Sequence, residues 1–295
     1  MIETWVLITV LACFFQNLRS LFQKKLQGTL SSLGATYTRF GYGLPFVIFY
    51  VCLLSYVYDL NISFLNIKFL LYCFVGGVAQ IVATYLLLKT FLLRNFAVAT
   101  AYSKTEPIQA IFLGIIILNE KITLLGFIAI IIAVIGVLLI SIEKNIKLAF
   151  NFGTLIGILS GTLFGISAVS FRGASLSLDH DNPLVSSAIT LLVAISLQTV
   201  FFTVYLAYKE PKQIVLSLRN LKYSLIVGFT GASASICWFY CMAVQNVAYV
   251  RALGQAELLF SFVISFYYLK EKVKINEMIG MLLMLFGIIL IVIYI

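Results

Sequence analysis

Long apolar runs separated by short polar breaks dominate the pattern along the chain. Each run is about twenty residues long, which is enough for a helix to cross a hydrocarbon core of about 30 Å. The runs lack the alternation with a period of two that strands of a membrane barrel show. The pattern therefore predicts an all-α integral membrane protein with ten transmembrane helices. They cover residues 4–23, 34–57, 69–88, 96–118, 122–142, 152–171, 184–207, 223–244, 247–269 and 274–295.

The second half of the chain repeats the first. A shift of 151 positions places Glu106 on Glu257 and Glu120 on Glu271. Only 11 residues are acidic, so two such coincidences in one register indicate an internal duplication. Because five spans per repeat is an odd number, the second copy must enter the bilayer in the opposite sense. We expect two five-helix inverted-topology repeats, at residues 1–144 and 152–295, with a binding site between them near the midplane.

Composition agrees with a membrane environment. Hydrophobic residues make up 62% of the chain and charged residues 11%, which leaves too little polar surface to coat a soluble globule. The first apolar run follows no basic segment and has no small-residue cleavage site, so we expect it to remain as the first span. The five cysteines form no CxxC pair, which argues against a zinc site and a disulfide framework. We expect a multi-pass protein of the cell membrane, the bacterial inner membrane.

Basic residues predict an orientation. Thirteen lie in the predicted loops after odd-numbered spans, against three on the other side, which are Lys68, Lys121 and Arg172. The positive-inside rule then places both termini outside the cytoplasm. The net charge of +9 therefore reflects topology, and without a basic stripe or a nucleic-acid fold it does not predict nucleic-acid binding. The thirteen are Lys24, Lys25, Lys89, Arg94, Lys144, Lys147, Lys209, Lys212, Arg219, Lys222, Lys270, Lys272 and Lys274.

Glu106 and Glu257 are the strongest candidate site residues. Each is the eleventh residue of its run, which at about 1.5 Å per residue is roughly 16 Å deep. An ionisable group at that depth costs at least ~2.5 kcal/mol, so it tends to face a cavity or a partner. By the repeat symmetry the two carboxylates should face each other between the halves. They are candidates for a proton carrier or for a counter-charge to a cationic group. Alternatively, each forms a fixed ion pair or hydrogen bond that ties helices together.

Helical spacing selects the neighbours of Glu106. Tyr102, Ser103 and Gln109 lie three or four residues away and share its face, so they are candidates for a polar wall. Lys104, two residues away, points to the opposite side. Either Lys104 faces the cavity and Glu106 packs against another helix, or local unwinding lets both reach the lumen.

Three further residues are candidate ligand contacts. Arg39 can clamp a carboxylate or phosphate with two hydrogen bonds, or pair with a glutamate of the fold. Arg251 either contacts the substrate or snorkels toward the interface. Trp238 either stacks on a flat or cationic group or packs in the core.

The first span carries a polar stripe. Gln16 and Ser20, with Gln23 and Lys24, follow helical spacing and must avoid lipid, so they form a cavity wall or bond to other helices. The polar residues of this span are Gln16, Asn17, Arg19, Ser20, Gln23 and Lys24.

Short motifs resemble the EamA family of the drug/metabolite transporter superfamily. In that family an alanine-rich fourth helix ends in a Leu-Gly-Glu-Arg-like turn, and Asn119 and Lys270 stand where its glycine is usual. The resemblance implies a ten-helix carrier, with export as the favoured direction, and termini in the cytoplasm, opposite to the charge count. The matching segments are 95–109, Leu118-Asn119-Glu120-Lys121, Gly126 and Gly136, Arg39-Phe40, and Leu269-Lys270-Glu271-Lys272.

Signatures of catalysis are weak. The single histidine, His180, lies between Asp179 and Asp181, and three consecutive loop residues seldom give good metal geometry. We therefore expect no metal, no cofactor, and transport without ATP. The favoured hypothesis is a secondary carrier of a small charged or zwitterionic metabolite, an amino acid or an amine, working by alternating access. Expected partners are the lipid bilayer and a coupling proton or ion, and the chain is a monomer or a homodimer. The rival hypothesis is a membrane-embedded enzyme or lipid-handling protein that uses the paired glutamates.

Overall fold

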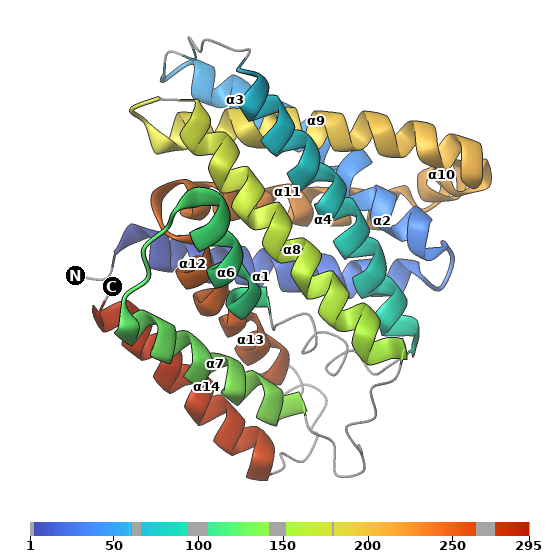
Figure 1. The fold of residues 1–295 in the computed structure, drawn as a ribbon. Helices are drawn as coiled ribbons and strands as arrows, with labels where there is room; N and C mark the ends of the chain where they lie inside the picture. The colour runs from blue at the N-terminus through green and yellow to red at the C-terminus, as the bar shows by residue number, and fades with distance from the viewer. Residues whose placement is uncertain are drawn as a thin grey trace.

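The fold is all-helical throughout the described part of the chain (Figure 1). The structure is a computed structural model that describes residues 3–58, 60, 66–93, 106–141, 152–178, 180–263 and 275–294. The first half contains α1 (Thr4–Leu26), α2 (Ser32–Gly41), α3 (Leu44–Ser55), α4 (Ile67–Leu93), α6 (Glu106–Leu118) and α7 (Leu124–Ser141). The second half contains α8 (Phe152–Ser177), α9 (Pro183–Lys209), α10 (Pro211–Arg219), α11 (Leu221–Val244), α12 (Val247–Leu253), the 3-10 turn η1 (Gly254–Ala256), α13 (Glu257–Val263) and α14 (Ile275–Tyr294).

Six helical segments of the described residues are long and apolar enough to cross a membrane. They are α1, α2 with α3, α4, α8, α9 and α11. Shorter apolar helices occupy Glu106–Leu118, Leu124–Leu139 and Met278–Tyr294. Every predicted span therefore contains helix where the chain is described. The count of ten crossings stays a prediction.

Helices of one half pack against helices of the other. α1 lies along α11, α4 along α8, and α7 along α14 (Figure 1). Under the 151-residue shift α1 corresponds to α8 and α4 to α11, so the first two pairs are equivalent. The third pair, α7 with α14, joins the two equivalent last helices. This arrangement is what an inverted repeat predicts, because a twofold axis exchanges the halves.

Glycine permits the closest of these approaches. A Cβ at Gly136 of α7 would lie 2.5 Å from the carbonyl oxygen of Gly280 and 2.5 Å from the backbone nitrogen of Met284 in α14. A Cβ at the equivalent Gly287 would lie 2.7 Å from the carbonyl oxygen of Ala129. Backbone cannot move aside as a flexible side chain can, so these two helices cross at glycine.

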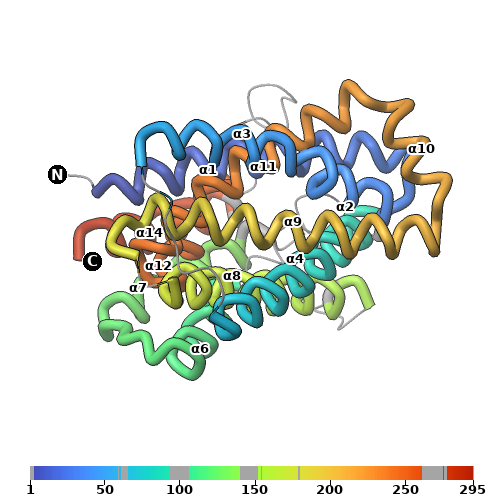
Figure 2. The backbone as a smooth tube through the Cα atoms, turned by 90° about the horizontal axis from the view of Figure 1, so that it is seen from above, coloured from blue at the N-terminus to red at the C-terminus, as the bar shows by residue number. Residues whose placement is uncertain are grey.

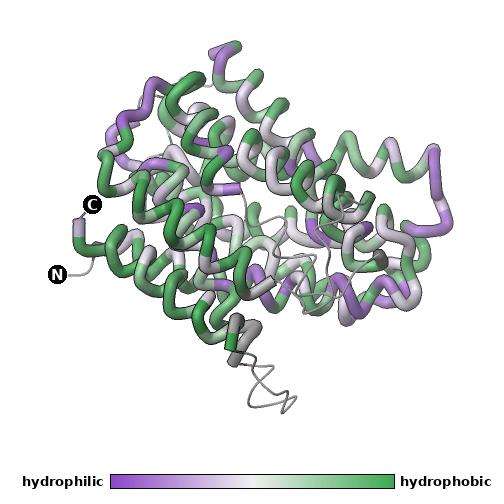
Figure 3. The backbone as a smooth tube through the Cα atoms, turned by 60° about the horizontal axis from the view of Figure 1, so that its bottom comes forward, coloured by the Kyte–Doolittle hydropathy of each residue, from purple (hydrophilic) through white to green (hydrophobic). Residues whose placement is uncertain are grey.

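Many large apolar side chains lie on the outside of the molecule, and a number of polar side chains are buried within it. Large apolar side chains such as Phe49, Ile116 and Val204 are exposed, while Gln198 and Gln255 are buried. Figure 3 shows long hydrophobic stretches along the helices and hydrophilic positions at many helix ends. Water would not favour such a surface, whereas acyl chains would. The chain is therefore a multi-pass membrane protein.

Two predicted spans are broken helices. We read 34–57 and 247–269 as continuous, but the first divides into α2 and α3 at residues 42–43, and the second is interrupted by η1. The first break follows from Gly43 and from Pro45, which lies in the first turn of α3 and cannot donate a backbone hydrogen bond. In transporters, discontinuous helices supply the groups that surround a central site. Both breaks lie beside the cavity described below.

Two further expectations are corrected. α10 was not predicted, and its Lys212 and Arg219 were counted as loop residues. Arg172 was counted as a loop residue, but it lies within α8, which runs to Ser177. Figures 1 and 2 place both ends of the chain at the same end of the molecule, with α10 at the other. An even number of crossings requires this arrangement of the termini.

Candidate functional site

A polar cavity lies between the two halves. Its empty volume is about 590 Å³, including space that is open to the outside. The first half contributes α1, α2, α4 and α6 to its wall, and the second half contributes α8, α11, α12 and α13. Five ionisable side chains line it, and each is at least nine-tenths buried: Arg19, Arg39, Glu106, Arg251 and Glu257.

Glu106 is paired with Arg251 across the two halves. The Nε of Arg251 and the Oε1 of Glu106 are 3.0 Å apart. The Arg251 guanidinium also lies over the Trp238 ring, 4.6 Å from its centroid. A cation held between a carboxylate and an aromatic face is well compensated for its loss of water. This pair fastens α12 to α6.

Glu257 is held by the first helix. The Nε2 of Gln16 donates to Glu257 Oε2 at 2.8 Å, and the indole Nε1 of Trp238 donates to Gln16 Oε1 at 2.9 Å. Asn17 donates to the backbone carbonyl of Glu257 at 3.3 Å. Gly254 makes room for the Trp238 ring, because a Cβ there would lie 2.6 Å from Cη2 of that ring. The two glutamates thus share one cavity but have different partners.

Arg19 and Arg39 form the basic wall of the cavity. Arg39 Nη1 donates to Thr84 Oγ1 at 2.7 Å, and Thr84 in turn donates to the carbonyl of Gln80 at 2.8 Å. Arg39 lies in the last turn of α2, where the negative end of the helix favours a cation. Arg19 Nη2 is 3.4 Å from Ser20 Oγ. The charges of Arg19 and Arg251 repel that of Arg39, whereas Glu257 attracts Arg19.

The structure corrects several sequence interpretations. Snorkelling by Arg251 is wrong, because the side chain is buried in the cavity wall. Gln109 is half-buried and is not part of the cavity lining, although it follows Glu106 at helical spacing. Lys24 is exposed, so it does not extend the polar stripe into the cavity.

Gln23 belongs to the stripe but donates to the carbonyl of Ala35 at 2.9 Å, so it joins α1 to α2. Tyr102, Ser103 and Lys104 lie outside the described residues.

Sequence reasoning missed several lining residues. Arg19 was named in the first span but was not chosen, because the stripe was traced through positions 16, 20, 23 and 24. Gln80 and Ser235 look unremarkable in sequence, since single polar residues in long apolar helices give no periodic signal. Among the residues that the structure describes, the lining consists of Gln16, Arg19, Ser20, Arg39, Gln80, Leu87, Phe91, Glu106, Phe164, Ser235, Trp238, Phe239, Met242, Arg251 and Glu257.

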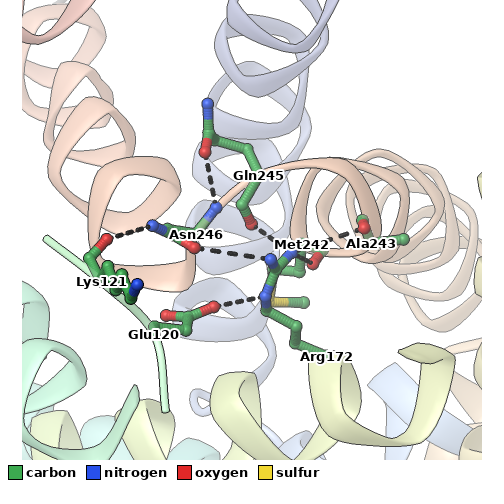
Figure 4. Close-up of polar contacts among 7 residues, drawn as sticks. All are labelled: Glu120, Lys121, Arg172, Met242, Ala243, Gln245 and Asn246. Carbon is green, nitrogen blue, oxygen red and sulfur yellow. Dashed lines mark hydrogen bonds and ion pairs between the residues drawn. The ribbon is translucent and has the colours of Figure 1, made fainter. Parts of the chain in front are cut away.

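A second polar cluster lies at the end of the molecule that holds the termini. Arg172 of α8 forms an ion pair with Glu120 and donates from Nη1 to the carbonyls of Met242 at 2.6 Å and Gln245 at 2.7 Å (Figure 4). Asn246 Nδ2 donates to the Lys121 carbonyl at 3.1 Å. The cluster therefore connects the turn between α6 and α7 with α8 and with the end of α11. It joins the two halves a second time.

The turn that carries Glu120 depends on Asn119. Its φ is 53°, the only positive value at a non-glycine residue in the described chain. Glycine adopts this left-handed region most easily, and asparagine is among the few other residues that tolerate it. The substitution of Asn for the usual glycine of the motif is therefore compatible with the same turn. Gly114 leaves space for the Glu120 carboxylate, since a Cβ there would lie 2.6 Å from Oε2.

Burial raises the pKa of the Glu120 carboxyl above its ordinary value, and the neighbouring Arg172 guanidinium opposes that rise.

In the loop before α9, His180 Nδ1 accepts a hydrogen bond from the backbone N–H of Asn182 at 3.0 Å. His180 thus supports the start of α9.

The fold and the cavity define a class: a multi-pass helical membrane protein whose two similar halves enclose a charged cavity. The EamA-like transporter family model matches residues 3–142 and again residues 151–293. The chain belongs to the EamA-like transporter family.

Other comparisons add the fold alone. One solved structure, described only as the crystal structure of a protein, is similar to this chain with a TM-score of 0.68 and 14% sequence identity. The similarity covers 98% of this chain and 96% of the other. No curated protein matches the sequence.

Proposed function

We propose that this protein is a secondary active transporter of a small charged or zwitterionic metabolite, such as an amino acid. The observation that carries the proposal is the cavity itself. Five buried ionisable side chains from both halves converge on one space between them. Holding that many charges away from water is unfavourable unless they pair with one another, as Glu106 and Arg251 do, or serve a polar ligand or a coupling ion. Family membership supports transport as the activity.

Alternating access is the mechanism that we propose. The halves are joined through the Glu106–Arg251 pair and the Arg172 cluster, and both must rearrange when the access side changes. The broken helices at residues 42–43 and 254–256 provide places where backbone geometry can change beside the cavity. Export, which the family resemblance favours, is a further part of the proposal. A bacterial inner-membrane location and coupling to a proton or another ion complete it.

Flux into proteoliposomes tests the proposal. Vesicles with purified protein receive labelled amino acids and amines, with and without an imposed pH gradient, and both uptake and chemical identity are measured. We expect unchanged substrate to accumulate. Glu106→Gln and Glu257→Gln should each insert normally and reduce flux by about tenfold or more, because each replaces a charge in the cavity.

Asp181→Asn is the matched control, since it makes the same change on an exposed loop. Unaltered flux and pH dependence in both glutamate variants would reassign these residues to structure. Chemical conversion of a substrate without its movement would instead favour a membrane-embedded enzyme or lipid-handling protein.

A further inference from the structure

Two guanidinium-bearing side chains lie side by side in the cavity wall. A Cβ built on Gly231 of α11 would be 3.4 Å from both Arg19 Cδ and Arg39 Cγ. Arg19 is 2% exposed and Arg39 is 5% exposed, and both line the cavity. Two like charges so close and so deeply buried are unfavourable together unless a negative charge lies near both.

Arg19 has hydrogen-bond donors to spare. Its Nε and Nη1 are buried and have no hydrogen-bond partner within the part of the chain that the structure describes. A guanidinium has five N–H donors and no acceptor, so only acceptor groups can satisfy it. Unpaired donors on a buried charge are costly, and Arg19 lines the cavity between the two halves. The missing acceptor is therefore expected from a ligand.

The charges of the cavity show what kind of ligand fits. Among the described lining residues there are three arginines and two glutamates, which leaves one positive charge in excess. Glu106 is taken by Arg251. Glu257 attracts the charge of Arg19, and its carboxylate accepts a hydrogen bond from Gln16. A ligand group with a single negative charge would balance the excess.

We propose that Arg19 and Arg39 bind the carboxylate of the transported metabolite. This inference rests on the proposed function and names the substrate class, a small carboxylic acid or amino acid. A carboxylate carries one charge and two acceptor oxygens, which suit guanidinium donors. A phosphate monoester carries about −1.5 to −2 at neutral pH, more than the excess. Arg251 is not the anchor, because Glu106 and Trp238 already hold it.

Matched carboxylate and amide probes test this inference on the purified full-length protein. Thermal unfolding is measured with acetate against acetamide, 4-methylpentanoate against 4-methylpentanamide, L-leucine against L-leucinamide, and inorganic phosphate, all at equal ionic strength. A ligand that binds only the native state raises the melting temperature. We expect at least one carboxylate to raise it while its amide at the same concentration does not.

Variants locate the effect. Arg19→Gln and Arg39→Gln should each weaken carboxylate binding by about tenfold to hundredfold, as expected for a lost hydrogen bond to a charged group. Arg219→Gln makes the same change on the exposed end of α10 and should leave binding unchanged. Should Arg19→Gln fail to fold, Arg19→Lys keeps the charge but loses the planar donors, and it should bind more weakly while remaining folded.

Three results would overturn the inference: no carboxylate acting more strongly than its amide, a preference that survives the Arg19 and Arg39 substitutions, or stabilisation by phosphate alone. The test separates this inference from the proposed function because it requires no flux. Carboxylate binding without transport in vesicles would reject the transporter and keep the site. Transport without any carboxylate preference would reject only the site.

Discussion

Asn119 shows how one backbone conformation accounts for a sequence motif. Its left-handed φ of 53° reverses the chain after α6, which brings Glu120 back toward Gly114 and Arg172. The requirement is for a residue that tolerates this conformation, and both the usual glycine and the asparagine found here do so.

Substitutions at Asn119 should separate conformation from side-chain chemistry. Asn119→Gly should leave stability nearly unchanged, whereas Asn119→Val should lower the free energy of unfolding by about 1–2 kcal/mol, because a branched Cβ clashes in the left-handed region. Reversible unfolding in mixed detergent micelles measures both. Equal losses in the two variants would show that the asparagine side chain matters more than the turn.

Single-residue chemistry was only partly predictable from the sequence. The depth of Glu106 and Glu257 in their apolar runs indicated a shared cavity, and the structure places both in one lining. Arg251 was harder to judge, because its distance from a helix end allows either snorkelling or burial. Only the tertiary packing, which brings Glu106 and Trp238 to it, decides between them.

Connections between helices carry much of the polar chemistry of this fold. The Arg172 cluster ties α8 of the second half to the turn between α6 and α7 of the first, and the same guanidinium donates to carbonyls at the end of α11 (Figure 4). Sequence patterns revealed the motif that contains Glu120. They could not reveal its partner, which lies 52 positions away on a different helix.

Substitutions that break the Arg172–Glu120 ion pair should lower the free energy of unfolding, and the effects of the two single substitutions should not add. Arg172→Gln should lower the free energy of unfolding by about 3–5 kcal/mol, because it leaves a buried carboxylate unpaired. Glu120→Gln should cost less, since Arg172 keeps its backbone carbonyls. The double variant should cost less than the sum of the two, as a double-mutant cycle would measure. Lys121→Gln is the control, because only the backbone of Lys121 takes part. Additive losses would mean that the pair contributes nothing.

Helix boundaries were predicted best where hydrophobic runs are unbroken. α9, for instance, begins at the Asn182-Pro183 signal, with the Asn182 side chain accepting from the Leu184 N–H at 2.9 Å. The breaks at residues 42–43 and 254–256 were missed because hydropathy stays high across them. Gly43 and Pro45 were the available signal for the first break, and Gly254 alone marks the second.

The arrangement of the helices in the whole molecule reflects the internal duplication. The equivalence of the α1–α11 and α8–α4 contacts is the architecture that the repeat predicted, and the family model matches the chain in two segments that cover these halves. What the repeat could not predict is the distribution of charge inside, because Arg19 and Arg39 have no charged counterpart 151 positions further on.

Orientation is the prediction that belongs to this scale. The termini lie at one end and α10, with Lys212 and Arg219, at the other (Figure 1). If the basic end faces the cytoplasm, alkaline phosphatase fused to the C-terminus should be active. A fusion in the connection between α9 and α10 should be silent and serves as the control. The reverse pattern would show that the orientation usual in the family holds instead.

The acids of the cavity exist in two equivalent copies, but its bases do not. The positions 151 residues beyond Arg19 and Arg39 are Ser170 and Thr190, which carry no charge. The internal twofold axis therefore relates the helices of the two halves, but it does not relate the positive charges in the cavity. An anion arriving from one compartment meets a different potential from one arriving from the other, so its affinity should differ between the two faces. Binding and conformational change form a closed thermodynamic cycle. Any difference in affinity between the two faces therefore equals the change that ligand binding makes in the equilibrium between the two access conformations.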